Sequence, residues 1–318
     1  MTEPLVSILI PTYNPNPEHL RAALKSVLAQ TEDRWTLLIH DDASSFDVRE
    51  HIGIALEDSR ITFLRSKNRL GIGGNWNACL KHKGSAPYVQ FLFQDDTWDP
   101  EYVERATKTL EAHADIDFVV VDHAYAFENM GEVQPFYDAL LRERRAVAPG
   151  RHDGREFLRE WLRRGIHPNL IGEPSFVMMC RSFVERVGLF REDMPQCLDA
   201  EYWTRCCMKG NFSYINENLG SFRVHKSAAS AQNEQAGAGI YDRFRCFQLI
   251  IEALPPGELR HEAIDARNAA LDTMVKKFFG RVRGGKRVST KGGGSLLPFA
   301  LRHPLLVLGT VLRQIRTR

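Results

Sequence analysis

The chain has 318 residues, of which 43% are hydrophobic and 26% are charged. These values are typical of a globular protein and exclude collagen-like, low-complexity and intrinsically disordered chains. The 42 lysines and arginines nearly balance the 40 aspartates and glutamates, and the net charge of +2 gives no sign of a nucleic-acid-binding protein. Because no stretch of about 18 uncharged apolar residues occurs, a membrane-spanning helix is not expected.

The cysteines and the first residues of the chain both bear on its location. The six cysteines form no C-x-x-C pair and lie mostly in apolar stretches, which favours reduced core thiols over disulfides or a zinc site. The opening Met-Thr-Glu-Pro leads directly into a strand-like run, without the basic flank and apolar segment of a secretory signal peptide. We therefore expect a cytoplasmic protein.

The first 125 residues alternate between short apolar runs and segments of helical periodicity. The expected strands are 6–10, 36–40, 61–64, 88–93 and 118–121, and the expected helices are 18–28, 48–56, 75–81 and 101–113. Strands that are apolar almost throughout and that alternate with helices are typical of a parallel sheet covered on both faces. The sequence therefore predicts an α/β fold.

The pattern is less regular in the rest of the chain. Residues 127–150 are predicted to form a loop. The later strands are expected at 176–179, 212–215 and 221–224, and the later helices at 155–164, 200–209, 236–253 and 258–282. We therefore expect an α/β domain over residues 1–230, a helical extension over 231–283 and a basic, apolar tail over 284–318, which begins in a glycine-rich linker.

Polar residues follow the first, second and fourth expected strands. They are Thr12, Tyr13 and Asn14, then Asp41 and Asp42, and then Gln94, Asp95 and Asp96. In an open parallel sheet, ligands bind at the carboxyl ends of the strands. Either acidic pair alone is compatible with a solvated turn. Two pairs at one edge repel each other unless a cation offsets their charge, so together they indicate a divalent metal with a phosphate ligand.

A phosphate-binding glycine loop does not compete for this edge. Residues 71–75 (GIGGN) lack the G-x-G-x-x-G spacing, and no Walker lysine followed by serine or threonine occurs there. A dinucleotide-dependent oxidoreductase is therefore not expected.

Six segments, in this order, resemble the motifs of family 2 glycosyltransferases, the inverting enzymes of GT-A fold. The opening motifs are 6–14 (VSILIPTYN), 41–44 (DDAS) and 94–96 (QDD), and the acceptor-side motifs are 172–175 (GEPS), 199–205 (DAEYWTR) and 222–225 (FRVH). The resemblance covers about residues 5–230. It implies a GT-A-type fold with a mostly parallel central sheet, here followed by C-terminal helices.

The resemblance also implies a role for each matching residue on the donor side. Thr12 and Tyr13 line the nucleoside pocket, and Asp41 hydrogen-bonds the base. Asp95 lies nearer the ribose, and Asp96 binds Mn²⁺ or Mg²⁺ on the diphosphate. The acidic motif opens with Gln94 where many members have aspartate, which puts Gln94 in doubt as a ligand.

Asp199 matches the catalytic base, and His225 is expected to add a metal or phosphate contact. A metal stabilises the departing nucleoside diphosphate as a Lewis acid, and a carboxylate on the opposite face takes the proton of the acceptor hydroxyl. Three alternatives stay open. Asp199 is also compatible with a helix N-cap, Glu201 competes with it as the base, and His225 is compatible with an ordinary histidine at a strand end.

The predicted function is metal-dependent, inverting transfer of a sugar from a nucleotide donor to a saccharide or lipid-linked acceptor, in cell-surface polysaccharide or glycolipid synthesis. One alternative is a sugar-phosphate nucleotidyltransferase, which needs a glycine-rich, basic loop after the first strand, where this chain has Pro-Thr-Tyr-Asn-Pro. Another is a non-catalytic module that binds a nucleotide sugar or a carbohydrate. Eight arginines between 142 and 164 favour a solvated helix face, with acceptor-phosphate binding as the alternative.

Charge is distributed unevenly along the chain. The last 46 residues carry eleven basic residues and no acid, whereas residues 1–272 carry a net charge of −9. Residues 296–312 are mostly apolar but are interrupted by Pro298, Arg302, His303 and Pro304. Such a segment suits the surface of an anionic membrane, at the inner face for a cytoplasmic enzyme. The alternative is a helix folded back on the body or a dimer contact.

Overall fold

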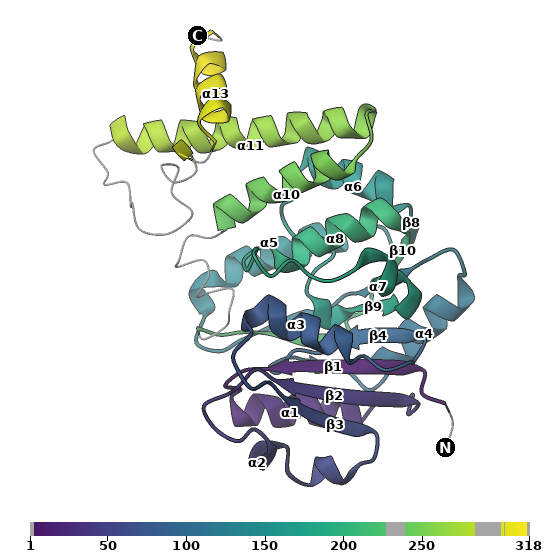
Figure 1. The fold of residues 1–318 in the computed structure, drawn as a ribbon. Helices are drawn as coiled ribbons and strands as arrows, with labels where there is room; N and C mark the ends of the chain where they lie inside the picture. The colour runs from purple at the N-terminus through teal and green to yellow at the C-terminus, as the bar shows by residue number, and fades with distance from the viewer. Residues whose placement is uncertain (1–2, 227–238, 284–299, 302, 317–318) are drawn as a thin grey trace.

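The computed structural model describes residues 3–226, 239–283, 300–301 and 303–316. Its centre is an eight-stranded sheet in the order β3-β2-β1-β4-β9-β6-β10-β8 (Figure 1). These strands are β1 (Val6–Thr12), β2 (Trp35–Asp41), β3 (Ile61–Arg65), β4 (Tyr88–Phe91), β6 (Phe118–Val121), β8 (Gly150–His152), β9 (Val177–Cys180) and β10 (Phe212–Ile215). Each predicted strand that falls in this sheet agrees with the observed one to within two residues at each end.

Most neighbouring strands run parallel. β1 pairs in parallel with β2 and β4, β2 with β3, and β6 with β10. β9 is antiparallel to both β4 and β6, and β8 is antiparallel to β10 at the edge of the sheet. β1 and β6 are buried along their whole length, as expected for strands covered on both faces. The predicted α/β class is confirmed.

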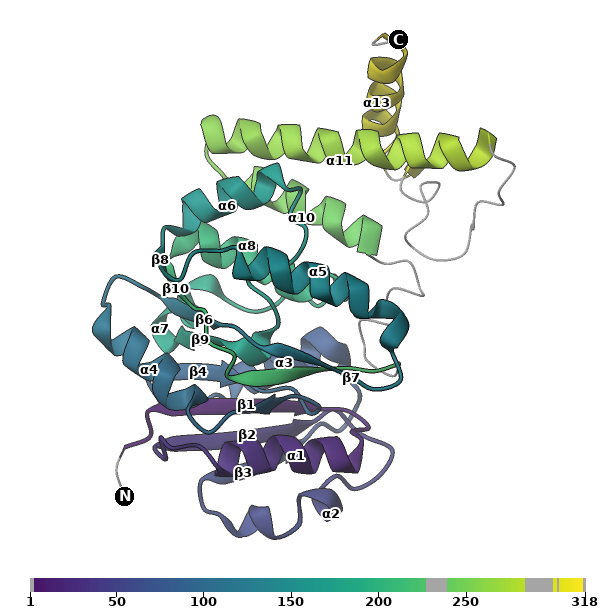
Figure 2. The same ribbon diagram turned by 180° about the vertical axis from the view of Figure 1, so that it is seen from behind.

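Two layers of helices cover the sheet (Figures 1 and 2). α1 (Pro17–Leu28), α2 (Arg49–Ile52) and α4 (Tyr102–Ala112) pack in one hydrophobic cluster with the sheet. α3 (Gly71–Lys81), α6 (Gly154–Arg163), α7 (Arg181–Val187) and α8 (Leu198–Lys209) pack in another. Short 3₁₀ turns lie at η1 (Gly53–Glu57), η2 (Gly131–Val133) and η3 (Pro174–Phe176).

A second, three-stranded sheet consists of β5 (Thr97–Trp98), β11 (Gly220–Val224) and β7 (Ala124–Phe127), with β11 in the middle. β5 begins directly after Asp96, and β11 ends directly before His225. Because Ser221 pairs with Thr97, this small sheet carries the segment with Arg223 and His225 back to the end of β4.

The predicted loop at 127–150 is wrong, because it contains helix α5 (Gln134–Arg145) and the start of β8. Only Leu140 and Arg144 of α5 are buried. Its apolar residues Phe136, Tyr137, Leu140 and Leu141 do follow helical spacing, so the helix was missed although periodicity indicates it.

Three C-terminal helices lie beyond the α/β layers: α10 (Gly239–Ala253), α11 (Glu258–Arg283) and α13 (Pro304–Arg316). α10 packs on α8 and α11, α11 also contacts α6, and α13 contacts α11 (Figure 1). The predicted domain boundary at residue 230 and the glycine-rich linker from residue 284 lie outside the described residues. In the part of the chain that the structure describes, no helix combines the length and the apolar character needed to cross a bilayer.

Candidate active site

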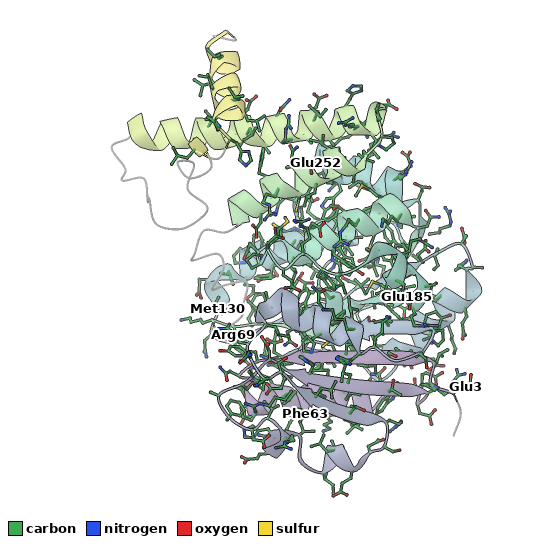
Figure 3. All side chains as sticks on the ribbon, in the orientation of Figure 1. Glu3, Phe63, Arg69, Met130, Glu185 and Glu252 are labelled. Carbon is green, nitrogen blue, oxygen red and sulfur yellow. The ribbon has the colours of Figure 1, made fainter. Side chains whose placement is uncertain are left out.

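The residues predicted to bind the nucleotide lie at the carboxyl edge of the sheet. β1 and β2 end side by side, and Thr12 pairs with Asp41 in the register of the two strands. Figure 3 labels Arg69 and Met130 at this edge and Glu3, which precedes β1, at the opposite one. The first two motifs are thus brought together by the topology of the sheet, as the sequence predicts.

Thr12 and Asp41 are both fully buried. The Thr12 hydroxyl donates to the His40 carbonyl at 3.3 Å. The Asp41 carboxylate accepts hydrogen bonds from the backbone N–H and the hydroxyl of Ser44, and it lies 3.4 Å from an Arg65 guanidinium nitrogen. Both side chains therefore fix the shape of the two turns that form the edge.

Asp42 has a different role from Asp41. Its two carboxylate oxygens accept the backbone N–H groups of Leu70 and Gly71 at 2.6 and 2.9 Å. These donors lie at the start of α3, so Asp42 caps that helix. This cap also explains why α3 begins four residues before the predicted helix at 75–81.

Tyr13 and Gln94 join the turn after β1 to the turn after β4. The Tyr13 N–H donates to Gln94 Oε1 at 2.9 Å, and Gln94 Nε2 donates to the Tyr13 carbonyl at 3.4 Å. The Arg69 guanidinium carbon lies 4.1 Å from the centre of the Tyr13 ring. Gln94 therefore serves as a bridge between the two turns, and Arg69 adds a positive charge that the sequence interpretation missed.

The two acids after β4 have different environments. Asp96 is fully buried, and its carboxylate oxygens accept the Ser175 hydroxyl at 2.6 Å and the Arg223 N–H at 3.0 Å. Burial, followed by the charge of Asp95, raises the pKa of Asp96 well above its ordinary value. Asp96 thus joins the end of β4 to the turn before β9 and to β11.

Asp95 is the acid that faces His225. Its Oδ2 lies 2.8 Å from His225 Nε2, and both side chains are partly exposed. The sequence interpretation placed the metal on Asp96 and His225. In the structure His225 lies against Asp95, whereas the buried Asp96 carboxylate accepts hydrogen bonds from Ser175 and Arg223.

A charged group on the other side of this pair was also missed. Glu128 Oε1 accepts a hydrogen bond from the Arg223 guanidinium at 2.6 Å and lies 3.0 Å from His19 Nε2 on α1. The His19 and His225 rings are in edge-to-face contact, with centroids 5.6 Å apart. Arg223 also donates to the Asp95 carbonyl at 3.0 Å, which holds the backbone of the acidic turn. No spacing in the sequence connects Glu128 or His19 to this site.

Asp199 lies in the first turn of α8. Its Oδ2 accepts a hydrogen bond from Asn169 Nδ2 at 2.8 Å, and its Oδ1 accepts the Ala200 N–H at 2.7 Å. The N-cap residue of α8 is Cys197, so Asp199 is not the N-cap. Burial raises the pKa of Asp199 from its ordinary value to about 6, and the negative charge of Glu173 adds to the effect.

Asn169 connects Asp199 to the turn that precedes β9. Besides its bond to Asp199, Asn169 Nδ2 donates to the Gly172 carbonyl, and Asn169 Oδ1 accepts the Gly172 N–H, both at 3.0 Å. Gly172 has a φ of +91°, a conformation that other residues rarely adopt. No motif in the sequence points to Asn169, because its contacts depend on the fold of this turn.

Glu173 lies next in this turn and carries a negative charge near Asp199. Its Oε2 is 2.7 Å from His123 Nε2 and 3.7 Å from an Arg144 nitrogen. Arg144 is fully buried and also donates to Asp122, to the His123 carbonyl and to the Tyr125 hydroxyl at 2.8–3.0 Å. Glu173 is therefore held by a buried network of charged and polar groups.

The arginine-rich segment 142–164 is only partly the solvated face that the sequence favours. Arg144 is the exception, because it lies in the buried network around Glu173. Five of the other arginines form ion pairs with nearby acids: Arg145 with Asp122, Arg151 with Asp115, Arg159 with Glu262, Arg163 with Glu160, and Arg164 with Glu143. These pairings account for five of the seven arginines other than Arg144.

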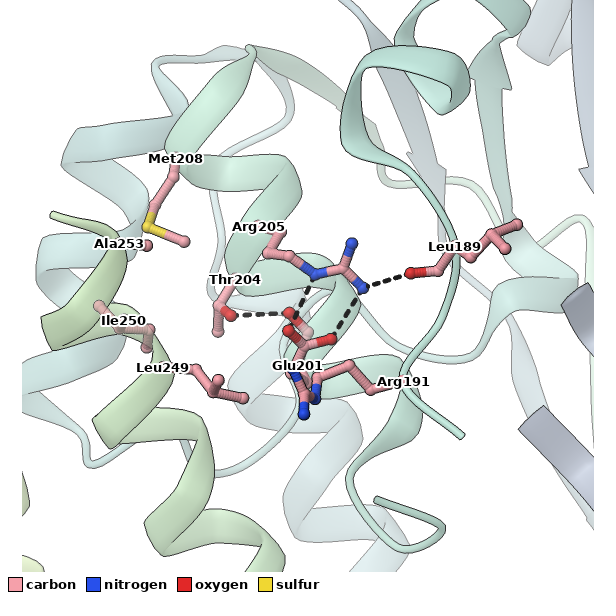
Figure 4. A pocket seen from close by; sticks show the side chains of 9 residues that line it. All are labelled: Leu189, Arg191, Glu201, Thr204, Arg205, Met208, Leu249, Ile250 and Ala253. Carbon is pink, nitrogen blue, oxygen red and sulfur yellow. Dashed lines mark hydrogen bonds and ion pairs between the residues drawn. The ribbon is translucent and has the colours of Figure 1, made fainter. Parts of the chain in front are cut away.

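Glu201 is occupied by a neighbour on its own helix. The Arg205 guanidinium donates to both of its carboxylate oxygens at 2.8 and 2.9 Å (Figure 4). Both residues line a pocket of about 280 Å³ that also includes Met208 of α8 and Ile250 of α10, and Asp199 is not among its lining residues. Residues two apart on a helix face different sides, so Glu201 and Asp199 belong to different surfaces of α8.

Other side chains with metal or redox chemistry are sparse. In residues 3–226 and the later described segments, no three His, Cys, Asp or Glu side chains gather as a metal-binding group. All six cysteines are free, and four of them are buried. A metal at the carboxyl edge would therefore need ligands from the bound substrate as well as from the protein.

Comparison with known proteins identifies the family. Residues 7–184 match the family model described as glycosyl transferase family 2. An uncharacterized glycosyltransferase of Methanocaldococcus jannaschii is 26% identical over 227 residues, which cover 70% of this chain and 72% of the relative. The Escherichia coli enzyme WfgD, named as a UDP-Glc:alpha-D-GlcNAc-diphosphoundecaprenol beta-1,3-glucosyltransferase, is 40% identical over 99 residues, or 31% of this chain and 38% of that one.

Solved structures agree on the fold. Residues 1–349 of Staphylococcus aureus TarS, solved in complex with UDP-GlcNAc, match with a TM-score of 0.61 at 14% identity, covering 88% of this chain and 74% of that one. The present chain spans 43% of the longer TarS structure. The mannosyltransferase PcManGT of Pyrobaculum calidifontis, solved with GDP-Man and Mn²⁺, matches with a TM-score of 0.57 at 16% identity, covering 99% and 88%. The fold is thus of GT-A type, and the chain belongs to glycosyltransferase family 2.

Proposed function

We propose that this enzyme transfers a sugar from a nucleotide-sugar donor to a saccharide or lipid-linked acceptor by a metal-assisted single displacement that inverts the anomeric centre. The observation that carries the proposal is the separation of two carboxylates with different surroundings. Asp95 lies with His225 at the carboxyl edge, and Asp199 lies on α8 with a raised pKa. The complexes of TarS with UDP-GlcNAc and of PcManGT with GDP-Man support a nucleotide-sugar donor.

Asp95 and His225 fit a divalent metal such as Mn²⁺ or Mg²⁺. A carboxylate oxygen and an imidazole nitrogen converge there to 2.8 Å, and Mg²⁺-type sites commonly combine one or two protein ligands with substrate phosphates. When bound, the metal supplies Lewis acidity that stabilises the departing nucleoside diphosphate. We propose Asp95 as the ligand in place of the predicted Asp96, since both Asp96 oxygens accept internal hydrogen bonds.

Asp199 is proposed as the base that takes the proton of the acceptor hydroxyl. A general base works best when its pKa lies near the operating pH, and a pKa of about 6 is much closer to neutrality than the ordinary value of 3.8. Asn169 holds the Oδ2 atom, and Glu173 keeps a second negative charge nearby. Glu201 is not proposed for this role, because Arg205 binds both of its oxygens.

The remaining donor contacts are proposed for Thr12, Tyr13 and Asp41 at the nucleoside, as the family resemblance implies. Their support is the position of all three where β1 and β2 end side by side. The Arg69 guanidinium above the Tyr13 ring adds a cation beside the place where an anionic nucleotide would bind.

A role in cell-surface polysaccharide or glycolipid synthesis is proposed from the relatives. WfgD is named for a diphosphoundecaprenol-linked acceptor, and a Rhizobium meliloti relative that is 35% identical over 108 residues is named as a succinoglycan biosynthesis protein. With a lipid-linked acceptor of this kind, the enzyme is proposed to be cytoplasmic and to work at the inner face of the membrane. The nucleotidyltransferase alternative is not pursued, since the turn after β1 carries no glycine-rich basic loop.

The decisive experiment is a binding and turnover screen with a panel of nucleotide sugars, with Mn²⁺ and with excess chelator. We expect one donor to bind in a metal-dependent way and to be hydrolysed or transferred with inversion. Asp95→Asn should weaken this binding, whereas Asp42→Asn, a matched change of an acid that caps α3, should leave the metal dependence unchanged. Donor turnover at full rate in the presence of chelator would contradict the proposed mechanism.

A further inference from the structure

Helix α13 carries an exposed face of leucines. Leu305, Leu308 and Leu312 are 82%, 54% and 48% exposed. Their spacing of three and four residues places them on one side of α13. Figure 1 shows α13 projecting from α11, at the end of the molecule opposite β3.

The opposite face of α13 is already in use. Leu306 and Val307 pack against a small cluster of Phe244 of α10 and Leu271 of α11, and Thr310 is fully buried. The His303 ring lies 5.5 Å from the Phe244 ring, measured between centroids. The leucine face is therefore a second apolar surface, which these intramolecular contacts do not cover.

The charge of the surrounding sequence indicates what this face binds. No acidic residue follows Asp272, and eleven basic residues do. Apolar residues that insert at the acyl boundary, together with basic residues that meet anionic headgroups, are the two components of interfacial binding.

A membrane-spanning helix and a coiled-coil dimer both agree less well with the length and charge of this segment. With a rise of about 1.5 Å per residue, the 13 residues of α13 span about 20 Å, which is short of the roughly 30 Å of a bilayer core. The exposed leucines of α13 lie within residues 305–312, whereas a coiled coil needs about three heptads or more. Both copies would also carry the net positive charge of residues 273–318.

We propose that the leucine face of α13 docks on an anionic membrane surface and holds the enzyme there. The helix lies on the membrane and does not cross it. This inference is independent of the donor and acceptor chemistry proposed above, although it would bring the enzyme to a lipid-linked acceptor.

The test is co-sedimentation of the full chain with vesicles, without donor or metal. Vesicles of phosphatidylcholine with about 30% phosphatidylglycerol should bind the protein, and vesicles of phosphatidylcholine alone should bind much less. Binding should fall when NaCl is raised from about 0.05 M to about 0.5 M. The double variant Leu305→Ser/Leu308→Ser should partition at least about tenfold less than the wild type.

A matched control separates this face from general surface hydrophobicity. Ile54 in η1 is 81% exposed, nearly the same as Leu305, so Ile54→Ser removes a similar exposed side chain from the other end of the molecule. It should leave vesicle binding unchanged. All these side chains are exposed, so the variants should fold, and circular dichroism checks this.

Equal vesicle binding by the wild type and the leucine variant would overturn the proposal. So would an absence of binding by the wild type at low salt. Sedimentation velocity provides the third arm, since a dimer that the leucine variant abolishes would assign the face to a second copy of the chain. None of these results would alter the donor screen described above.

Discussion

Replacing Asp199 with asparagine should make the protein more stable and much less active at the same time. The carboxylate is raised in pKa from 3.8 to about 6, so ionising it in the folded state costs up to about 3 kcal/mol. Asparagine removes this cost. It also replaces one accepting oxygen with an NH₂ group, and because Oδ1 and Oδ2 both accept hydrogen bonds, one bond worth about 1 kcal/mol is lost.

The sign of the effect depends on pH. A raised pKa means that the folded protein holds this proton more tightly than the unfolded chain does, so wild-type stability falls as pH rises from about 4 to about 6. Above about pH 7, Asp199→Asn should therefore raise the free energy of unfolding by about 2 kcal/mol. Near pH 4 the advantage should disappear, and the lost hydrogen bond should leave the variant slightly less stable.

Urea unfolding followed by tryptophan fluorescence at several pH values measures this difference, and a transfer assay measures activity on the same samples. Transfer should fall by about 10²-fold or more in Asp199→Asn, while donor binding is retained. In the wild type, transfer should rise with pH through an apparent pKa of about 6.

Glu201→Gln is the matched control, since it makes the same chemical change two residues along α8. It should lower stability by weakening the bidentate bond to Arg205, and it should leave transfer per folded molecule near the wild-type level. If Glu201→Gln loses transfer and Asp199→Asn stays active, Asp199 is not the base. If Asp199→Asn destabilises the protein at high pH, the burial argument is wrong.

Three further predictions concern the groups around these two acids. Asp95→Asn should weaken Mn²⁺-dependent donor binding, measured by calorimetry, by more than Asp96→Asn does, because Asp96 is buried and has a raised pKa. Asn169→Ala should lower kcat and shift the pH profile of transfer to a higher apparent pKa. The reason is that Asp199 loses a donated hydrogen bond that favours its ionised form. An unchanged pH profile would show that Asn169 does not position the base. Arg144→Met should lower the free energy of unfolding by about 3 kcal/mol or more, because it removes the buried guanidinium that pairs with both Asp122 and Glu173. The free energy of unfolding is measured from urea midpoints. A loss under 1 kcal/mol would show that Arg144 contributes little to the stability of the buried network.

Much of the fold could be predicted because its strands are unusually apolar. β1 and β6 are buried at every position, so their sequences stand out as short continuous runs. The rule that parallel strands end at one edge then places Asp41 beside Thr12, as observed. Helix α5 was missed, since its few apolar residues, Phe136, Tyr137, Leu140 and Leu141, follow helical spacing but lie in a mostly polar segment.

The sequence could not show that Asp96 is buried while Asp95 contacts His225. Adjacent acids in a turn are equivalent until the fold decides which one points inward. Here the decision is made by the Ser175 hydroxyl and the Arg223 N–H, which lie 79 and 127 residues away in the chain and which both bind Asp96. Asn169 was missed for a similar reason, since it meets Asp199 across 30 residues.

The buried carboxyl of Asp96 also has a consequence for protein engineering. It joins three separate parts of the chain, and one of them is the turn that carries Glu173. A designer who exchanged the segment around Ser175 would therefore also disturb the end of β4, where Asp95 contacts His225.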